Sequence, residues 1–102
     1  MKHVQTKGTR SFFKVVAETA RSQAATMVLK PGQSTGGDDN LHEDADQWLY
    51  VVSGKGRATV GRTTERLEKG SLLLIEAGET HEIRNAGRTL LVTINVYAPP
   101  EY

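Results

Sequence analysis

Short runs of hydrophobic residues recur along the chain, and residues that favour turns separate them. The clearest run is QWLYVVS at residues 47–53, whose aromatic and β-branched side chains favour a strand. Pro31-Gly32 and Lys69-Gly70 are strong turn signals. Further runs predict strands at residues 11–17, 23–30, 57–60, 63–67, 71–75, 80–84 and 88–97. This pattern predicts an all-β sandwich or barrel.

Two stretches depart from the strand pattern. Residues 17–25 are the one candidate for a helix, although β-branched neighbours weaken it. Residues 33–46 are too polar for a core strand and predict a loop. The acidic side chains near the end of this loop, Glu43, Asp44 and Asp46, are expected to be solvated.

Side chains alternate between the two faces of a strand, so the pattern also predicts which residues point inward. If Gln47 faces the interior, the residues at 49 and 51 share its face. If His81 faces inward, so do Ile83 and Asn85, and Asn85 is expected to secure a turn by hydrogen bonding. The interior would then be apolar with a few polar groups, which is typical of a small-molecule pocket.

The opposite face of the strand at 47–53 carries Trp48 and Tyr50. Large aromatic side chains on an outer face suggest a surface that another subunit covers. We therefore expect a homodimer.

The 102 residues suggest one domain over 1–102, with 37% hydrophobic and 25% charged residues and a net charge of +1. This balance lacks the basic excess of a nucleic-acid binder. The first seven residues contain no hydrophobic signal core, and no apolar run approaches the roughly 20 residues that span a membrane. A cytoplasmic protein with no nucleic-acid or membrane partner is the expectation.

The candidate chemistry lies in two polar clusters, one around His42 and one around His81. Imidazole is the commonest metal ligand among side chains. The chain has no cysteine, which excludes a thiolate metal site and a cysteine nucleophile.

The first cluster resembles the first motif of the cupin superfamily: a glycine, His-x-His, three or four residues, Glu, six residues and a glycine. Asn40 stands at the first histidine of that motif, His42 at the second and Gln47 at the glutamate. Gly54 follows at the expected spacing.

The second cluster resembles the second cupin motif: glycine, five residues, Pro-x-Gly, two residues, His, three residues and Asn. Gly70, Gly78, His81 and Asn85 match it at every spacing, with Glu76 in place of the proline. The resemblance covers about residues 28–96 and implies a jelly-roll β-barrel, or double-stranded β-helix. The strands at 11–30 would complete the barrel or a dimer interface.

The resemblance implies a divalent transition metal (Mn, Fe, Ni or Zn) held by Asn40, His42, Gln47 and His81. Some metal-binding cupins have glutamine at the glutamate position, including a branch that acts on unsaturated uronic sugars. All four ligands here are neutral, so the ion would keep its charge and favour an anionic ligand. The set lacks the two-histidine, one-carboxylate triad of many non-haem iron oxygenases.

Two functions follow from this ligand set. One is a metal-dependent enzyme for a small, sugar-acid-like substrate, with isomerase or lyase chemistry favoured over oxygen insertion. The other is a barrel that binds or senses a small molecule without metal or catalysis. The sequence leaves both open.

Overall fold

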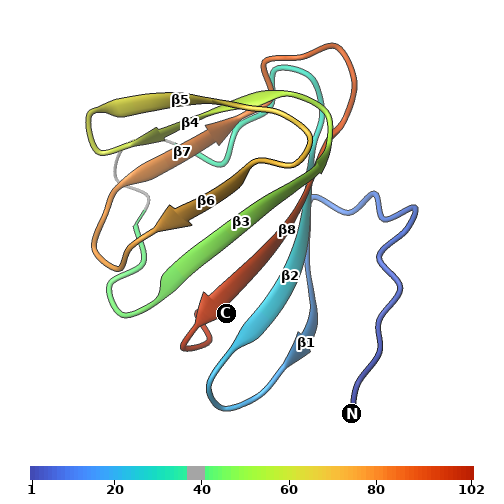
Figure 1. Cartoon of the computed structure of the whole chain (residues 1–102), viewed down its shortest axis with the longest axis vertical. Coiled ribbons are helices and arrows are strands. Elements are labelled where there is room, and N and C mark those ends of the chain that lie inside the picture. Colours follow the sequence, from blue (N-terminus) through green and yellow to red (C-terminus); the bar gives the residue numbers. More distant parts are fainter. Residues whose placement is uncertain (37–40) are drawn as a thin grey trace.

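The computed structural model describes residues 1–36 and 41–102 and consists of eight strands (Figure 1). The strands are β1 (Phe13–Glu18), β2 (Gln23–Leu29), β3 (Asp46–Ser53), β4 (Gly56–Val60), β5 (Thr63–Leu67), β6 (Leu72–Ile75), β7 (His81–Arg84) and β8 (Leu91–Ala98). The described residues contain no helix long and apolar enough to cross a membrane.

All strand pairs are antiparallel and form two sheets. One sheet has the order β1-β2-β8-β3-β6, and the other has the order β5-β4-β7. Figure 1 shows the smaller sheet at the upper left, beside the longer strands of the five-stranded sheet. This all-β architecture confirms the predicted fold class.

The core forms where alternate residues of both sheets point inward. Its fully buried members include Leu49 and Val51 of β3, Ile83 of β7 and Leu91 of β8. Trp48 and Tyr50, between the inward positions of β3, remain 43% and 44% exposed. The alternation predicted from the sequence is therefore confirmed.

Residues 17–25, the one candidate for a helix, form no helix. Residues 17 and 18 end β1, and Gln23 begins β2, so this stretch is the turn of a β-hairpin. The turn is stabilised by the Thr19 hydroxyl, which accepts hydrogen bonds from the backbone N–H groups of Arg21 and Ser22 at 3.1 and 3.2 Å. Threonine often makes such local bonds in turns rather than in helices.

The last strand begins at Leu91, later than the pattern predicts, because Asn85 organises the turn before it. The Asn85 side chain donates to the carbonyls of Leu29 and Thr89, each at 2.8 Å. Its oxygen accepts from the Gly87 N–H at 2.9 Å. The turn-forming role expected for Asn85 is confirmed.

Gly54 allows the β3–β4 turn to approach β8 closely. Its φ is +90°, and a β-carbon there would overlap the Leu90 carbonyl oxygen and lie 2.8 Å from the Leu91 α-carbon. Only glycine avoids both problems. The spacing of the first motif therefore ends on a residue that the packing requires.

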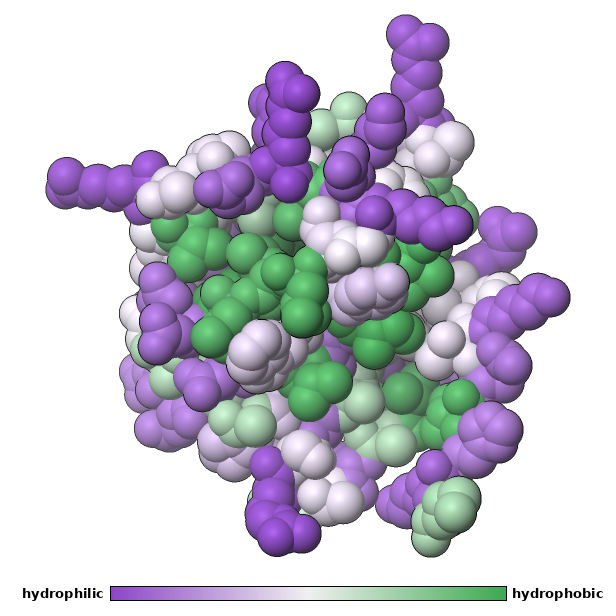
Figure 2. Space-filling model, in the orientation of Figure 1, coloured by the Kyte–Doolittle hydropathy of each residue, from purple (hydrophilic) through white to green (hydrophobic). Residues whose placement is uncertain are grey.

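Hydrophobic side chains gather over β3 and β6 on the face shown in Figure 2. Trp48 pairs with Leu74 and Tyr50 with Leu72 across these strands. Leu72 is 63% exposed and Leu74 39% exposed. We call these four residues, together with Val52, the outer patch.

Candidate functional site

A cavity of about 240 Å³ lies between the two sheets. It is lined by Phe12, Phe13, Met27, Thr35, His42, Gln47, His81, Ile83, Tyr97 and Tyr102. Most of these side chains are apolar or aromatic, with a few polar groups among them, as in most small-molecule sites. The cavity is smaller than the roughly 300–1,000 Å³ of sites for drug-sized ligands, so it fits a small molecule.

The two histidines of the predicted site meet in this cavity. The His42 and His81 rings have centroids 5.0 Å apart, and the residues are 5% and 4% exposed. His42 lies in the loop before β3, whereas His81 begins β7.

Backbone contacts join the loops that carry the two motifs. The Gly78 N–H donates to the His42 carbonyl at 2.7 Å. The Asp46 carboxylate accepts from the Ala77 N–H at 2.9 Å. Asp46 therefore helps to join the loops, and all three acidic residues, Glu43, Asp44 and Asp46, are exposed as expected.

A row of buried polar side chains orients Gln47. The Thr93 hydroxyl donates to the Met27 carbonyl at 3.2 Å and leaves its oxygen to accept from the Asn95 amide at 3.0 Å. The Asn95 oxygen then accepts from Gln47 Nε2 at 2.9 Å. Since the Met27 carbonyl can only accept, this row directs Gln47 Oε1 toward His42 Nε2, 3.2 Å away.

A carboxylate outside both motifs contacts the other nitrogen of His42. Glu101 Oε1 lies 3.1 Å from His42 Nδ1. A carboxylate at Nδ1 favours a proton on that nitrogen and fixes the orientation of the ring.

His81 has a comparable arrangement with a backbone partner. Its Nδ1 lies 3.4 Å from the Glu79 carbonyl oxygen, which favours a proton on Nδ1. Burial is the largest influence on its pKa and lowers it from the usual 6.5, with a smaller contribution from His42 in the same direction. The hydrogen bond to Glu79 opposes this change. His81 thus favours the neutral form, which a metal ligand requires.

Aromatic rings form one wall of the cavity beside His42. The ring centroid of Tyr97 lies 5.3 Å from that of His42, and the Tyr102 centroid lies 5.7 Å from it. Phe13 packs on Tyr102 with a centroid distance of 4.7 Å. Burial, first among several causes, raises the pKa of both tyrosines, so their hydroxyls stay neutral near pH 7.

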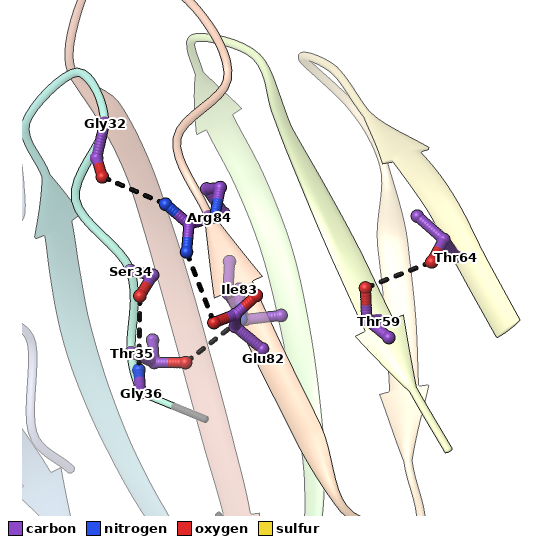
Figure 3. Close-up of polar contacts among 9 residues, drawn as sticks. All are labelled: Gly32, Ser34, Thr35, Gly36, Thr59, Thr64, Glu82, Ile83 and Arg84. Atoms are coloured by element: carbon purple, nitrogen blue, oxygen red, sulfur yellow. Dashed lines mark hydrogen bonds and ion pairs between the residues drawn. The ribbon is translucent and has the colours of Figure 1, made fainter. Parts of the chain in front are cut away.

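Thr35 also lines the cavity, and β7 holds it in place (Figure 3). The Thr35 hydroxyl accepts from the Ile83 N–H at 3.0 Å, and the Thr35 N–H donates to the Ile83 carbonyl at 3.0 Å. Arg84 also donates to the Gly32 carbonyl at 3.3 Å. This segment belongs to the predicted loop, and its contacts with the edge of β7 give it a defined place.

The structure brings His42, Gln47 and His81 together, whereas Asn40 lies outside the described residues. Among the residues that are described, no group of three or more His, Cys, Asp or Glu side chains could hold a metal ion. A metal site here would therefore depend on amide oxygen as well as imidazole nitrogen.

One pair of donor atoms has a spacing that a shared divalent ion would allow. Two ligand atoms at about 2.1 Å from one ion and at right angles lie roughly 3.0 Å apart. His42 Nε2 and Gln47 Oε1 are 3.2 Å apart. The partners of Nδ1 in both histidines leave Nε2 as the nitrogen available to a metal, which at His42 would take the place of the hydrogen bond to Gln47 Oε1.

Several residues that act on the site were not singled out from the sequence, among them Thr93, Asn95, Tyr97 and Glu101. The first three alternate along β8, so polar residues at every second position of an apolar strand were an available signal. Glu101 follows two prolines and carries no such signal.

Two antiparallel sheets that enclose a small cavity, with one histidine from the loop before β3 and one from the start of β7, define a double-stranded β-helix barrel. The chain belongs to the cupin domain family, whose model matches residues 25–97. Cupins commonly bind transition metals.

Two curated bacterial proteins are similar in sequence to this chain. The uncharacterized protein YrkC of Bacillus subtilis is 29% identical over 86 residues, which are 78% of this chain and 45% of YrkC. The chain spans about half the length of the curated relatives it matches.

Solved structures show the same barrel. BH2720 of Bacillus halodurans has a TM-score of 0.90 and 29% identity, covering 95% of this chain and 76% of that one. A "predicted oxalate decarboxylase" of Thermotoga maritima has a TM-score of 0.71 and 28% identity, covering 76% and 66%.

Proposed function

We propose that this cupin binds a divalent transition metal through His42, His81 and Gln47 and acts on a small anionic substrate. The observation that carries the proposal is the arrangement of His42 Nε2 and Gln47 Oε1, 3.2 Å apart in a buried cavity. The partners of each side chain direct these two atoms toward one point. Asn40 stays a proposed fourth ligand on the motif alone.

The charges around the cavity support an anionic substrate only if a metal is bound. The lining residues of the described chain include no Lys or Arg, and Glu101 places a carboxylate beside His42. A divalent ion held by neutral ligands would leave about one positive charge once Glu101 is counted. A small anion would balance that charge, and the neighbour described as a predicted oxalate decarboxylase has an anionic substrate in its name.

The metal would polarise a carbonyl or hydroxyl oxygen of the substrate and so ease the loss of a proton from it. The residues of the chain supply the rest. Gln47 and His42 hold fixed orientations, and the aromatic wall shields the reacting centre from water. Isomerisation or elimination needs only such positioning and proton transfer, without an oxidant.

Elemental analysis of protein purified without added metal tests the proposal. We expect near-stoichiometric Mn, Fe, Ni or Zn, which is lost in the His42→Ala and His81→Ala variants. His3→Ala is the matched control, because His3 lies exposed in the N-terminal segment and should keep full metal content. Absence of metal after incubation with each of the four ions would refute the proposal.

The second candidate is a metal-free barrel that binds a small molecule without catalysis. The lack of three charged or imidazole ligands among the described residues favours it. Without a metal, the cavity would disfavour anions and would prefer neutral ligands that pack on Phe13 and Tyr97. Calorimetry with small carboxylates separates the candidates, since anion binding that requires added metal supports the enzyme.

A further inference from the structure

A buried side chain anchors the last residues of the chain beside the cavity. Gln23, at the start of β2, is 1% exposed. Its oxygen accepts from the backbone N–H groups of Glu101 and Tyr102 at 3.2 and 2.9 Å. Its amide donates to a main-chain oxygen of Tyr102 and to the Glu18 carboxylate. A buried amide whose bonds are mostly made to one segment holds that segment in a defined place.

The anchored residues each place one side chain against the site. Glu101 contacts His42 Nδ1 at 3.1 Å, and its side chain is 27% exposed. The Tyr102 ring packs 4.7 Å from Phe13 and 5.1 Å from Tyr97, measured between ring centroids. Tyr102 is itself 60% exposed, so it forms the outer part of the cavity wall.

We propose that residues 99–102 act as a strap: Gln23 anchors it, Glu101 is the positioning residue of His42, and Tyr102 closes the cavity wall. The inference rests on the proposed function, because it assigns His42 Nε2 to the metal. The contact of Glu101 with Nδ1 fixes the orientation of the ring, so that Nε2 points at Gln47 Oε1 and is the nitrogen available to a metal. Because Glu101 and Tyr102 depend on the same anchor, Gln23, release of the strap would open the cavity wall and free the His42 ring at the same time.

The first test measures the protonation of the two His42 ring nitrogens in metal-free protein, so its result does not depend on metal binding. Long-range ¹H–¹⁵N NMR at a fixed pH reports which ring nitrogen carries a proton. We expect a protonated Nδ1 in the wild type and loss of that proton in Glu101→Ala, where Gln47 Oε1 is left as the acceptor of the pair and favours a proton on Nε2. Glu101→Gln, which retains an oxygen acceptor, should restore the wild-type pattern. Glu43→Ala is the matched control, because it removes an exposed carboxylate from the loop that carries His42.

The second test measures the strap and its effect on the metal. Amide hydrogen exchange at residues 101 and 102 should be protected in the wild type and faster in Gln23→Met. With Zn²⁺ as the probe, Glu101→Ala should lower affinity about 10- to 100-fold, the usual effect of losing such a partner of a ligand histidine. Tyr102→Leu should speed the loss of Zn²⁺ to excess EDTA.

Three results separate the possible failures. An unchanged His42 pattern in Glu101→Ala overturns the positioning role. Exchange at residues 101 and 102 as fast in the wild type as in an unstructured peptide overturns the strap. Normal NMR and exchange results with no Zn²⁺ binding leave the strap supported and instead contradict the proposed metal function.

Discussion

The hydrogen bond between Gln47 and Asn95 should couple the stabilities of two buried residues, and a double-mutant cycle can measure that coupling. Gln47 is 3% exposed and Asn95 is fully buried, and Gln47 Nε2 lies 2.9 Å from Asn95 Oδ1. The variants are Gln47→Met and Asn95→Leu, alone and combined. Both replacements are apolar and close in size to the original side chain, so the cavity term is small.

Each single substitution leaves one buried polar atom without its partner. Asn95→Leu strands the Gln47 amide, and Gln47→Met strands the Asn95 oxygen. An unsatisfied buried group costs about 1–3 kcal/mol, whereas removing both partners avoids that cost. The lost contacts to His42 and Thr93 occur equally in the single and double variants and cancel. The coupling energy should therefore be about 1–3 kcal/mol.

Urea unfolding followed by circular dichroism and by Trp48 fluorescence gives the four stabilities. The measurements need a chelator, because bound metal would add its own stabilisation. Each 1 kcal/mol corresponds to about 4–8 °C in Tm for a domain of this size. Thr59→Val and Thr64→Val form the control cycle, since their hydroxyls lie 3.1 Å apart in an exposed position (Figure 3). Additivity within about 0.5 kcal/mol at the Gln47–Asn95 pair would refute the orienting role of the row.

Three other predictions address stability and assembly. Since burial lowers the pKa of His81 below 6.5, the His81 side chain takes up a proton in the unfolded chain before it does so in the folded protein as the pH falls. The free energy of unfolding should therefore be highest above about pH 6.5 and decline below it. Urea midpoints measured against pH should show this decline, and the decline should be smaller in His81→Gln. Gly54→Ala should destabilise by about 2 kcal/mol or more, because the new β-carbon meets backbone atoms, and a Tm within 2 °C of wild type would contradict this close packing. The exposed outer patch predicts a homodimer, so light scattering at micromolar concentration should give the mass of a dimer. The double variant Trp48→Glu, Leu72→Glu should give the mass of a monomer. A monomeric wild type would contradict the predicted dimer.

Much of the fold follows from local patterns in the sequence. The period of two at residues 47–52 identified the inner face of β3, and the motif spacing brought His42 and His81 to one cavity. Where the prediction failed, at residues 17–25, short apolar residues fit a helix and a hairpin equally well. Pairing with β8 along the whole of β2 decides the outcome, and that contact is not visible in local sequence.

The partners of the site residues were harder to predict because they come from distant segments. Asn95 contacts Gln47 only because β3 and β8 are neighbours in the sheet, with Gln47 opposite Tyr97 and Leu49 opposite Asn95. Glu101 reaches His42 only because Gln23 binds the backbone beside it. Both contacts depend on strand order and on a side-chain anchor, which no spacing rule encodes.

The position of Thr93 has a consequence for altering this protein. Its hydroxyl lies in the row that begins at the Met27 carbonyl, and Thr93 is not among the described residues that line the cavity. Thr93→Ser would keep the oxygen of Gln47 turned toward the site, whereas Thr93→Val would allow both amides to turn over. A substitution at Thr93, outside the cavity lining, would thus change whether Gln47 presents an oxygen or an N–H group to the cavity.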